Sequence, residues 1–245
     1  IFPNTLSAPP TGTATPRSSV NVFDPDFQNP RTFQTSLGVE REIVANITVG
    51  ADYTYAKMEN LQRLFDINIA PSSGVAADGR LLYQSPRPNP NFNLIVQAES
   101  TARGMYNAMT LSAKRRWSGG SQWYNRGLQY QAFYTYAHTK DDDSNERKFQ
   151  DIFYQDWQNL GAEYTWSNTD IRHNFVMNAT WAFAGDVQAG FIFNTRSGAP
   201  YSRLSSTDLN GDGAANANDR QFLNGVDTGR NAYRQPTYSR LDLRI

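Results

Sequence analysis

The residues whose types and spacing point most directly to chemistry lie in residues 208–219, which read DLNGDGAANAND. Oxygen-bearing side chains occupy the first, third and fifth positions, glycine the sixth and a carboxylate the twelfth, which is the pattern of a calcium-binding loop. Calcium prefers hard oxygen ligands, and the glycine allows the sharp turn that directs them inward. The pattern predicts a structural calcium site formed by Asp208, Asn210, Asp212, Ala214 through its backbone carbonyl, Asn216 and Asp219.

Two features of this segment leave a second interpretation open. The twelfth position carries Asp219 instead of the longer glutamate, and no clear helical pattern precedes Asp208. Asp, Asn and Gly also favour metal-free turns, in which side-chain oxygens accept backbone N–H groups. If an ion binds, the short Asp219 predicts weak affinity, about 0.1 to 1 mM, and a role in ordering the loop rather than in catalysis.

No set of residues predicts an enzyme. The triplet Asp227-Thr228-Gly229 occurs in aspartic proteases, but their chemistry needs two aspartates that share a proton, and this sequence has one copy. His138 and His173 are the only histidines, and no arrangement with serine and aspartate for nucleophilic catalysis is legible. The absence of cysteine excludes thiol nucleophiles, disulfides and cysteine-based zinc sites.

Two further loop features have plain structural interpretations. Asp141, Asp142 and Asp143 could hold a second cation, but a solvated acidic loop is the favoured interpretation. Apolar residues after them recur at intervals of three and four and predict an amphipathic helix that packs on neighbouring structure rather than presenting an aromatic surface to a ligand or partner. These residues are Phe149, Ile152, Phe153, Trp157 and Leu160.

Composition limits the elements that can position these loops. The chain has 245 residues, and its 23 lysines and arginines balance 23 aspartates and glutamates, which disfavours nucleic-acid binding. Its apolar runs span only a few residues, far short of the roughly 18 to 20 that a transmembrane helix needs. A mean hydropathy of −0.63 fits both a soluble protein and a transmembrane β-barrel. The sequence starts at Ile1 without a leader pattern, so we expect any export signal to lie outside it and treat the chain as a fragment.

Alternation of apolar and polar residues identifies the strands. Residues 1–31 are rich in proline, which disfavours helices and central strands, and are predicted to form a long extracellular loop. Beyond them about seven strands are expected, over residues 32–40, 43–56, 105–113, 128–136, 170–183, 187–194 and 241–245, with an extension over 92–99.

The lengths of the connections distinguish a barrel from a β-sandwich. Short or medium connections, at residues 40–42, 117–126 and 184–186, alternate with long ones at about 57–103, 140–169 and 197–236. All long loops therefore emerge on one side, as in outer-membrane barrels with short periplasmic turns and long extracellular loops. The fold class predicted for residues 32–245 is an all-β, antiparallel up-and-down transmembrane β-barrel segment of about seven or eight strands.

Aromatic residues support this fold because they gather at both ends of the strands, where membrane interfaces would lie, although rings also fill ordinary cores. Those expected at the long-loop ends are Tyr53, Tyr55, Tyr134, Tyr136 and Tyr238, and those at the short-turn ends are Trp117, Trp181 and Phe183. The lipid-facing side chains are predicted to include Ile43, Ile47, Val49, Phe175, Phe191 and Phe193. The lumen-facing ones are predicted to include Asn46, Thr48, Gln129, Gln131, Asn178 and Gln188. Seven strands cannot close a membrane barrel, so further strands are expected on at least one side.

Several motifs, in order along nearly the whole chain, resemble the barrel region of TonB-dependent outer-membrane receptors, specifically the Oar-like group. The matching stretches are residues 23–27 (FDPDF), 33–41 (FQTSLGVER), 65–68 (FDIN), 106–109 (YNAM), 170–175 (DIRHNF), 197–201 (SGAPY), 208–220, 229–231 (GRN) and 241–244 (LDLR). The resemblance implies the later part of a large barrel in the bacterial outer membrane, without the N-terminal plug, the TonB-contacting segment or a carboxypeptidase-regulatory-like domain. The implied partners are outer-membrane lipid, the remainder of the barrel with its plug, and a TonB-type energy transducer.

Three functions remain open at this point. The leading hypothesis is part of a receptor and transporter barrel for the uptake of a scarce ligand such as a peptide, glycan or chelate. The second is a structural or adhesive outer-membrane protein whose loops bind other surfaces without transport. The third is a soluble secreted β-protein stabilised by calcium. An upstream plug would separate the first from the second, and a need for detergent during extraction would separate both from the third.

Overall fold

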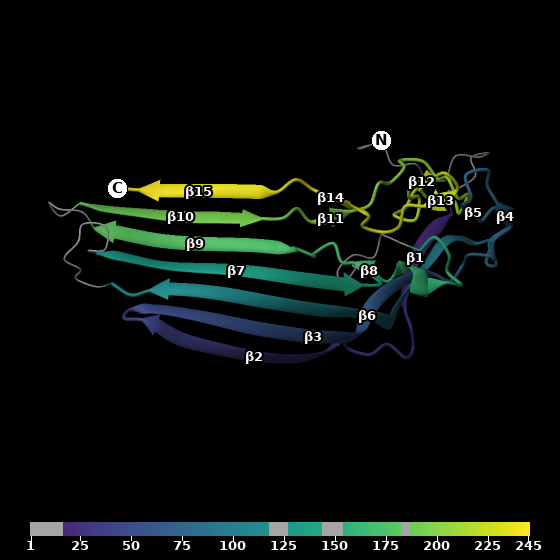
Figure 1. The fold of residues 1–245 in the computed structure, drawn as a ribbon. Helices are drawn as coiled ribbons and strands as arrows, with labels where there is room; N and C mark the ends of the chain where they lie inside the picture. The colour runs from purple at the N-terminus through teal and green to yellow at the C-terminus, as the bar shows by residue number, and fades with distance from the viewer. Residues whose placement is uncertain (1–16, 118–126, 144–153, 183–186) are drawn as a thin grey trace, which may run out of the picture.

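The computed structural model describes residues 17–117, 127–143, 154–182 and 187–245. Within them, seven long strands form one antiparallel sheet in the order β15-β10-β9-β7-β6-β3-β2, and Figure 1 shows them side by side. This confirms the prediction of an all-β, up-and-down segment of about seven or eight strands. The long strands are β2 (Arg31–Val44), β3 (Ile47–Asp66), β6 (Phe92–Arg115), β7 (Leu128–Asp141), β9 (His173–Ala182), β10 (Gln188–Arg196) and β15 (Tyr238–Arg244).

Two shorter strands extend the sheet at the end where the long loops emerge. β1 (Ser18–Phe23) pairs in parallel with the first half of β6, and β8 (Thr165–Trp166) pairs with the end of β7. β1 lies inside the segment predicted to be a loop, so that prediction is wrong for these six residues. The β-branched Val20 and Val22 alternate with polar neighbours there, which suits a strand. Residues 1–16 of the predicted loop lie outside the described residues.

The first tight turn lies at residues 45–46, not at the predicted 40–42, because β2 continues to Val44. Asn46 adopts a φ of 68°, and its backbone N–H donates to the Glu42 Oε1 at 2.8 Å. Asparagine visits this left-handed conformation more readily than most residues. The prediction that Asn46 is a lumen-facing strand residue is therefore wrong. The connections predicted at residues 117–126 and 184–186 fall almost wholly outside the described residues.

The first long connection spans residues 67–91, which is shorter than the predicted 57–103. β3 runs on to Asp66 and β6 begins at Phe92, so the predicted extension over 92–99 is the first part of β6 itself. Their pairing shifts register on both sides of Leu61, next to Asn60 with a φ of 56°. A strand crosses a membrane in about 9 to 11 residues, so the extra length projects β3 and β6 beyond it. The other long connections, 142–172 and 197–237, agree closely with the prediction.

The register of the long strands assigns each residue to one of two faces, since directly paired residues point to the same side of a sheet. Val49 belongs to one row that crosses the seven long strands, and the rows of Ile47 and Ala51 lie on the same face. These rows hold Phe175, Phe191 and Phe193, as predicted; Ile43 lies at a register shift near the turn. The Val49 row consists of Arg41 on β2, followed by Val49, Ala113, Ala132, Met177, Phe193 and Leu241.

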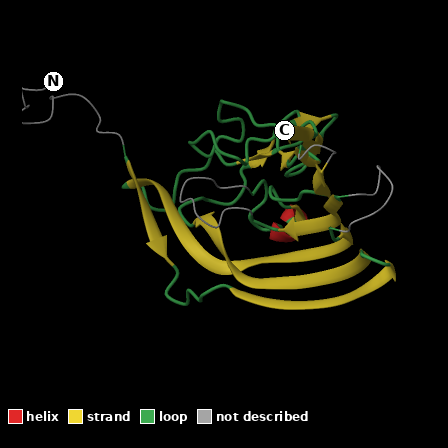
Figure 2. Cartoon of the chain, turned by 90° about the vertical axis from the view of Figure 1, so that its left-hand side faces the viewer, coloured by secondary structure: helices red, strands yellow, loops and turns green. Residues whose placement is uncertain are grey.

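The opposite face is polar and lies under the loops. Thr48, Lys114, Gln131 and Asn178 form one row on it, and Gln129 and Gln188 share this face as predicted. Figure 2 shows a curved sheet with the loops over its concave side. A cavity of about 310 Å³ joins polar-face residues to loop residues, which makes the polar face the concave one; its lining includes Tyr106, Thr135, Asn194, Arg196, Thr169 and Ile171.

Aromatic residues on the apolar face follow the predicted interfaces in part. Tyr53, Tyr134 and Tyr136 lie on that face near the long-loop end, and Trp181 lies on it near the short-turn end. Tyr238 differs: it pairs with Arg196 on the polar face, and the Arg196 Cζ lies 5.4 Å from its ring centroid. Its predicted interface position is wrong, because the register of β15 turns it inward. Tyr55 shares the apolar face, Trp117 lies just beyond β6, and Phe183 lies outside the described residues.

The buried apolar core lies at the long-loop end and not across the middle of the sheet. It consists of Leu64, Val96, Ala98 and Tyr154, with Phe27, Phe65, Leu94 and Leu160 packed around it. Apolar residues of the long strands remain exposed, as expected for a wall in contact with lipid. Among the described residues, no helix is both long and apolar enough to cross a membrane.

Candidate functional site: the loop cap

We use the term loop cap for the described parts of the three long connections, residues 67–91, 154–172 and 197–237, and the strand ends they contact. Short elements shape it, and in Figure 1 they gather beyond one end of the long strands. They are β4 (Gly74–Val75) with β5 (Leu81–Leu82), β11 (Pro200–Tyr201) with β14 (Tyr233–Arg234), β12 (Phe222–Leu223) with β13 (Val226–Asp227), and the 3-10 helix η1 (Leu160–Glu163).

The helix predicted from the spacing of aromatic residues falls in part outside the described residues, and residues 154–159, which are described, are not helical. Residues 144–153 lie outside the described residues, and the only helical turn in the described remainder of this connection is η1. Trp157 and Leu160 nevertheless pack inward, as expected: the Trp157 ring lies 6.0 Å from that of Phe65, and Leu160 borders the core.

Asp141, Asp142 and Asp143 do not form a solvated acidic loop, so that prediction is wrong. All three are buried at the end of β7. Asp142 pairs with Arg63 at 2.8 Å, and Asp141 pairs with Arg230 at 2.6 Å. A buried carboxylate is costly without a partner of opposite charge, and the two arginines supply it. The acidic run is therefore an anchor for the loop cap.

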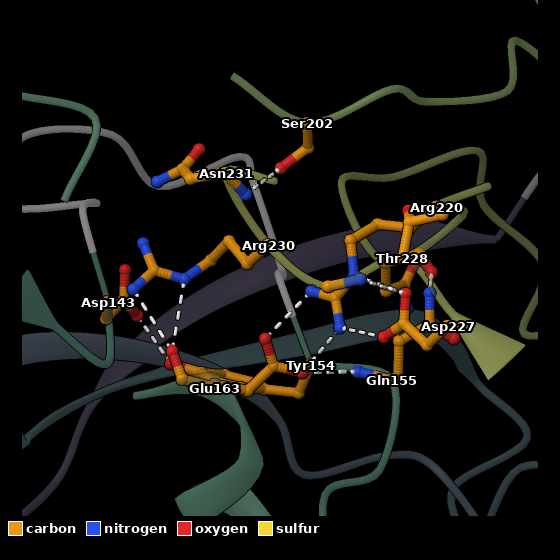
Figure 3. Close-up of polar contacts among 12 residues, drawn as sticks. Asp143, Tyr154, Gln155, Glu163, Ser202, Arg220, Asp227, Thr228, Arg230 and Asn231 are labelled. Atoms are coloured by element: carbon orange, nitrogen blue, oxygen red, sulfur yellow. Dashed lines mark hydrogen bonds and ion pairs between the residues drawn. The ribbon is translucent and has the colours of Figure 1, made fainter. Parts of the chain in front are cut away.

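Arg220 forms the centre of the polar network. Its guanidinium donates to both carboxylate oxygens of Glu163 at 2.8 Å and to Asp227 Oδ2 at 2.7 Å. Figure 3 shows Arg220 between these two carboxylates, which come from different loops. Arg220 and Glu163 are both almost fully buried, and the two carboxylates raise the pKa of the guanidinium against the opposing effect of burial. Bidentate pairing of this kind fixes geometry as well as charge.

Further arginines join the loop cap to the strands. The Arg230 guanidinium donates to the carbonyl oxygens of Asp141 and Glu163, in addition to the Asp141 carboxylate. Arg234 pairs with Asp170, whose Oδ1 also accepts the backbone N–H of Thr139 at 2.7 Å. These contacts bind residues 197–237 to the end of β7 and to the start of β9. Asp66 and Arg87 add a pair at 2.6 Å within the first connection.

Asp143 differs from its two neighbours because its main partner is neutral. Tyr154 donates its hydroxyl to Asp143 Oδ2 at 2.5 Å, while Oδ1 is buried and has no partner among the described residues. Burial raises the pKa of Asp143 to about 7; the Tyr154 hydrogen bond and the charges of Arg230 and Arg63 oppose this shift. The charge of Asp143 is therefore expected to change near neutral pH.

The predicted calcium loop is closed by hydrogen bonds. Asp208 accepts the backbone N–H groups of Gly211 at 2.7 Å and Gly213 at 2.9 Å. Asp219 accepts N–H groups from residues 209, 210 and 216. Ala214 donates its N–H to the Asp212 carboxylate, so the side-chain contacts are those of successive Asx turns. No three His, Cys, Asp or Glu residues in the described ranges are grouped so that they could hold a metal ion.

Asp212 is the residue of this loop whose environment favours a cation. Its Oδ2 accepts from Asn210 at 3.2 Å and from Asn218 at 2.8 Å, and the carboxylate is buried. Burial raises the pKa of Asp212, and the negative charge of Asp208 adds to the effect. The Asn218 Oδ1 is buried and has no partner within the described residues, whereas the predicted ligand Asn216 contributes its N–H to Asp219. The oxygen donors suit a hard cation.

The other sequence motifs have structural partners. Asp227 of the protease-like triplet accepts from Arg220 and from the backbone of Gly229, instead of facing a second aspartate. The Nδ1 atom of His173 forms a 2.8 Å hydrogen bond with the Tyr134 hydroxyl on the apolar face. His138 lies on the same face. Both histidines occupy the aromatic region near the long-loop end of the strands.

The family of the chain is identified by comparison with models of known protein families. The family model described as an outer membrane beta barrel domain matches residues 1–241. The chain belongs to this outer membrane β-barrel family. The match places the chain in the bacterial outer membrane and decides against a soluble secreted protein. A search of curated proteins finds no match.

A solved structure supports the fold of this outer membrane barrel domain. The chain is similar to the outer membrane transporter YddB from Escherichia coli, with a TM-score of 0.57 and 10% sequence identity. The similarity covers 89% of this chain and 26% of the transporter. The chain thus spans about a quarter of the length of the structure that it matches. At this identity the likeness concerns the fold alone.

Sequence reasoning missed the arginines of this barrel domain as structural residues. Arg220 and Glu163 are 57 residues apart, and Arg230 and Asp141 are 89 apart. No local period links such positions. One signal was present: the motif stretches 208–220 and 229–231 contain Arg220 and Arg230 and lie in a connection with many polar residues.

Proposed function

We propose that this barrel domain is part of a TonB-dependent receptor and transporter that takes up a scarce ligand. The observation that carries the proposal is a curved wall with an apolar outer face and a polar inner face, over which three long connections fold into one buried polar network. A network of buried ion pairs holds the loops in one arrangement, which a specific binding surface requires.

The same proposal names the partners. Outer-membrane lipid contacts the apolar face, and the remainder of a larger barrel with its plug completes the wall. A TonB-type energy transducer supplies energy from the periplasmic side, as the motif resemblance implies. The ligand enters from the loop cap toward the polar face, where the cavity lined by Tyr106, Asn194 and Arg196 lies. We propose no enzymatic step.

Uptake can be tested in cells that carry the full-length gene. A strain lacking the gene and its parent receive, in turn, a labelled peptide mixture, a glycan mixture and an iron chelate, with and without a protonophore, and label is counted in the periplasmic fraction. Accumulation of one class that needs both the gene and the proton gradient supports the proposal. Accumulation that ignores the protonophore indicates a passive pore. Equal accumulation in both strains, together with reduced attachment of the deletion strain to surfaces, favours the structural or adhesive alternative.

We also propose a structural calcium ion in residues 208–219. Asp208, Asp212 and Asp219 supply carboxylates, Asn210 a side-chain oxygen, and Ala214 and Asn216 complete the predicted set. The buried charge of Asp212 supports the proposal, since a cation would offset both its desolvation and its repulsion from Asp208. The ion would order the connection and take no part in transport chemistry.

A further inference from the structure

The loop cap contains a second cavity, which is distinct from the one on the polar face and lies next to the Arg220 network. Its volume is about 450 Å³, within the range of ~300 to 1,000 Å³ typical of small-molecule sites. Residues of two long connections line it, so it exists only when the connections are folded together. The lining comprises Arg80, Arg203, Leu204, Ser205, Leu209 and the stretch from Asp219 to Phe222.

Arg203 gives the cavity an exposed positive charge. Its guanidinium carbon lies 4.4 Å from the centroid of the Tyr233 ring, which holds the side chain in place. Within the described residues, no carboxylate lies at ion-pair distance from Arg203. Arg203 itself is exposed. A guanidinium that is positioned but unpaired is suited to receive an anionic group.

Arg80 places a second guanidinium beside the same cavity, and its surroundings are built. The side chain is 4% exposed, its Nε donates to Asp78 at 2.8 Å, and its carbon lies 4.7 Å from the Phe222 ring centroid. Nη2 donates to the Arg220 carbonyl at 3.3 Å, whereas Nη1 is buried and has no acceptor among the described residues. An unmet donor on a buried guanidinium is costly, and a ligand acceptor that reaches Nη1 from the cavity would satisfy it.

The backbone beside Arg80 is also fixed. Gly79 has a φ of 93°, and a Cβ there would lie 2.5 Å from the Gly225 carbonyl oxygen. Only glycine allows this approach between the first and third long connections. The contact holds together the two connections that carry Arg80 and Phe222, one on each side of the cavity.

Apart from Ser205 and Gln221, the remaining wall is apolar, and the carboxylate of its acidic residue is turned away. Leu204 and Leu209 are exposed at 51% and 42%, and Phe222 lies beside Arg80. The carboxylate of Asp219 accepts three backbone N–H groups of its own loop and so directs its charge there. The Arg220 guanidinium is engaged by Glu163 and Asp227. The cavity thus offers two arginines and an apolar surface.

We propose that this cavity binds a carboxylate attached to an apolar group, such as the C-terminus of a peptide that ends in a large apolar residue or an aryl-substituted acid. The carboxylate pairs with Arg203 and supplies the acceptor for Arg80, and the apolar group packs on Leu204, Leu209 and Phe222. This assignment deepens the proposed receptor role by naming its ligand class.

Binding to the purified full-length protein in detergent tests the assignment by calorimetry. The probes are acetyl-Leu-Phe with a free carboxylate, its C-terminal amide, and 4-phenylbutyrate, which separates a peptide source from a simple acid. The acids are expected to bind at least tenfold more tightly than the amide, because charge-assisted hydrogen bonds to arginine are lost in the amide. Equal binding of acid and amide, or no binding of either acid at millimolar concentration, would overturn the proposal.

Matched variants locate the site. Arg203→Gln should weaken acid binding about tenfold or more and leave amide binding unchanged, whereas Arg31→Gln, an exposed arginine on β2 away from the cavity, should change neither. Arg80→Lys keeps the charge but removes the fork, and an intermediate loss is expected. Heat-modified migration on a gel shows that each variant is folded. Unchanged acid binding in folded Arg203→Gln contradicts the site. Calorimetry needs no energised transport, so absent binding with intact uptake would sink the cavity assignment alone.

Discussion

Leu37 on β2 is 79% exposed, while Arg220 in the loop cap is 2% exposed, so the two regions reverse the usual placement of apolar and charged side chains. The wall presents leucine, valine and phenylalanine outward because its outer solvent is lipid. The loop cap, beyond the end of the wall, buries paired charges beside a small apolar core. In each region the surroundings therefore decide which side chains are exposed, and the cap depends on ion pairs between residues far apart in the sequence.

The largest expected effect comes from removing the central charge of the loop cap. Arg220→Ala leaves Glu163 buried without its main partner, and breaking a buried pair in this way costs about 3 to 5 kcal/mol. We expect much faster hydrogen exchange in residues 154–172 and 197–237, with unchanged exchange in the long strands. Arg240→Ala, which breaks an exposed pair with Asp242, serves as the control and should have little effect. Uniform loss across both regions would mean that cap and wall are not separable.

A charge placed on the wall tests its two faces. Val49→Arg puts a cation on the apolar face, where a charge costs about 2 to 4 kcal/mol at the membrane centre and less toward the turn, whereas Thr48→Arg on the polar face should cost close to zero. Heat-modified migration of membrane fractions measures the assembled protein. Equal assembly of the two variants would contradict the assignment of faces that the register gives.

Acidity should act on the cap through Asp143. Its pKa is raised from 3.8 to about 7 by burial, so the folded cap holds a proton that the unfolded chain has lost between these values. The stabilising contribution is fully present below about pH 3.8 and disappears as the pH rises through about 7. Protease resistance of the cap should therefore fall from pH 6 to pH 8 in the wild type by more than in Asp143→Asn. An identical pH profile in the two proteins would show that Asp143 does not titrate there.

The smallest expected effect concerns calcium. At about 1 mM calcium, a site of 0.1 to 1 mM affinity adds about 0.4 to 1.4 kcal/mol to the stability of the folded loop. Chelation should modestly increase proteolysis within residues 197–237 and leave strand content unchanged, and Asp212→Ala should abolish the response. Resistance that is the same with calcium and with chelator supports the metal-free Asx turns instead.

How far the sequence predicts the molecule differs between the regions for a physical reason. A strand is recognised by the alternation of apolar and polar residues over a short stretch. The strands that carry Val49 and Phe193, and the two faces of each, can therefore be predicted from the local sequence. The position of a turn is harder to predict, because residues near Asn46 have a similar propensity for turns. The cap could not be derived, because a run such as Asp141 to Asp143 looks solvated until Arg63 and Arg230 arrive from distant segments.

The long pairing of β3 with β6, which continues on both sides of the register shifts at Leu61, has a mechanical consequence. One ladder runs from Ile47 and Arg115 at the short-turn end to Asp66 and Val96 beside the core of the cap. A force that pulls the cap outward along the strands loads these hydrogen bonds in shear, so that many must yield together. A force that pulls β2 sideways from β3 breaks the hydrogen bonds between these two strands one after another. Single-molecule pulling should accordingly find high rupture force along the first direction and low force along the second.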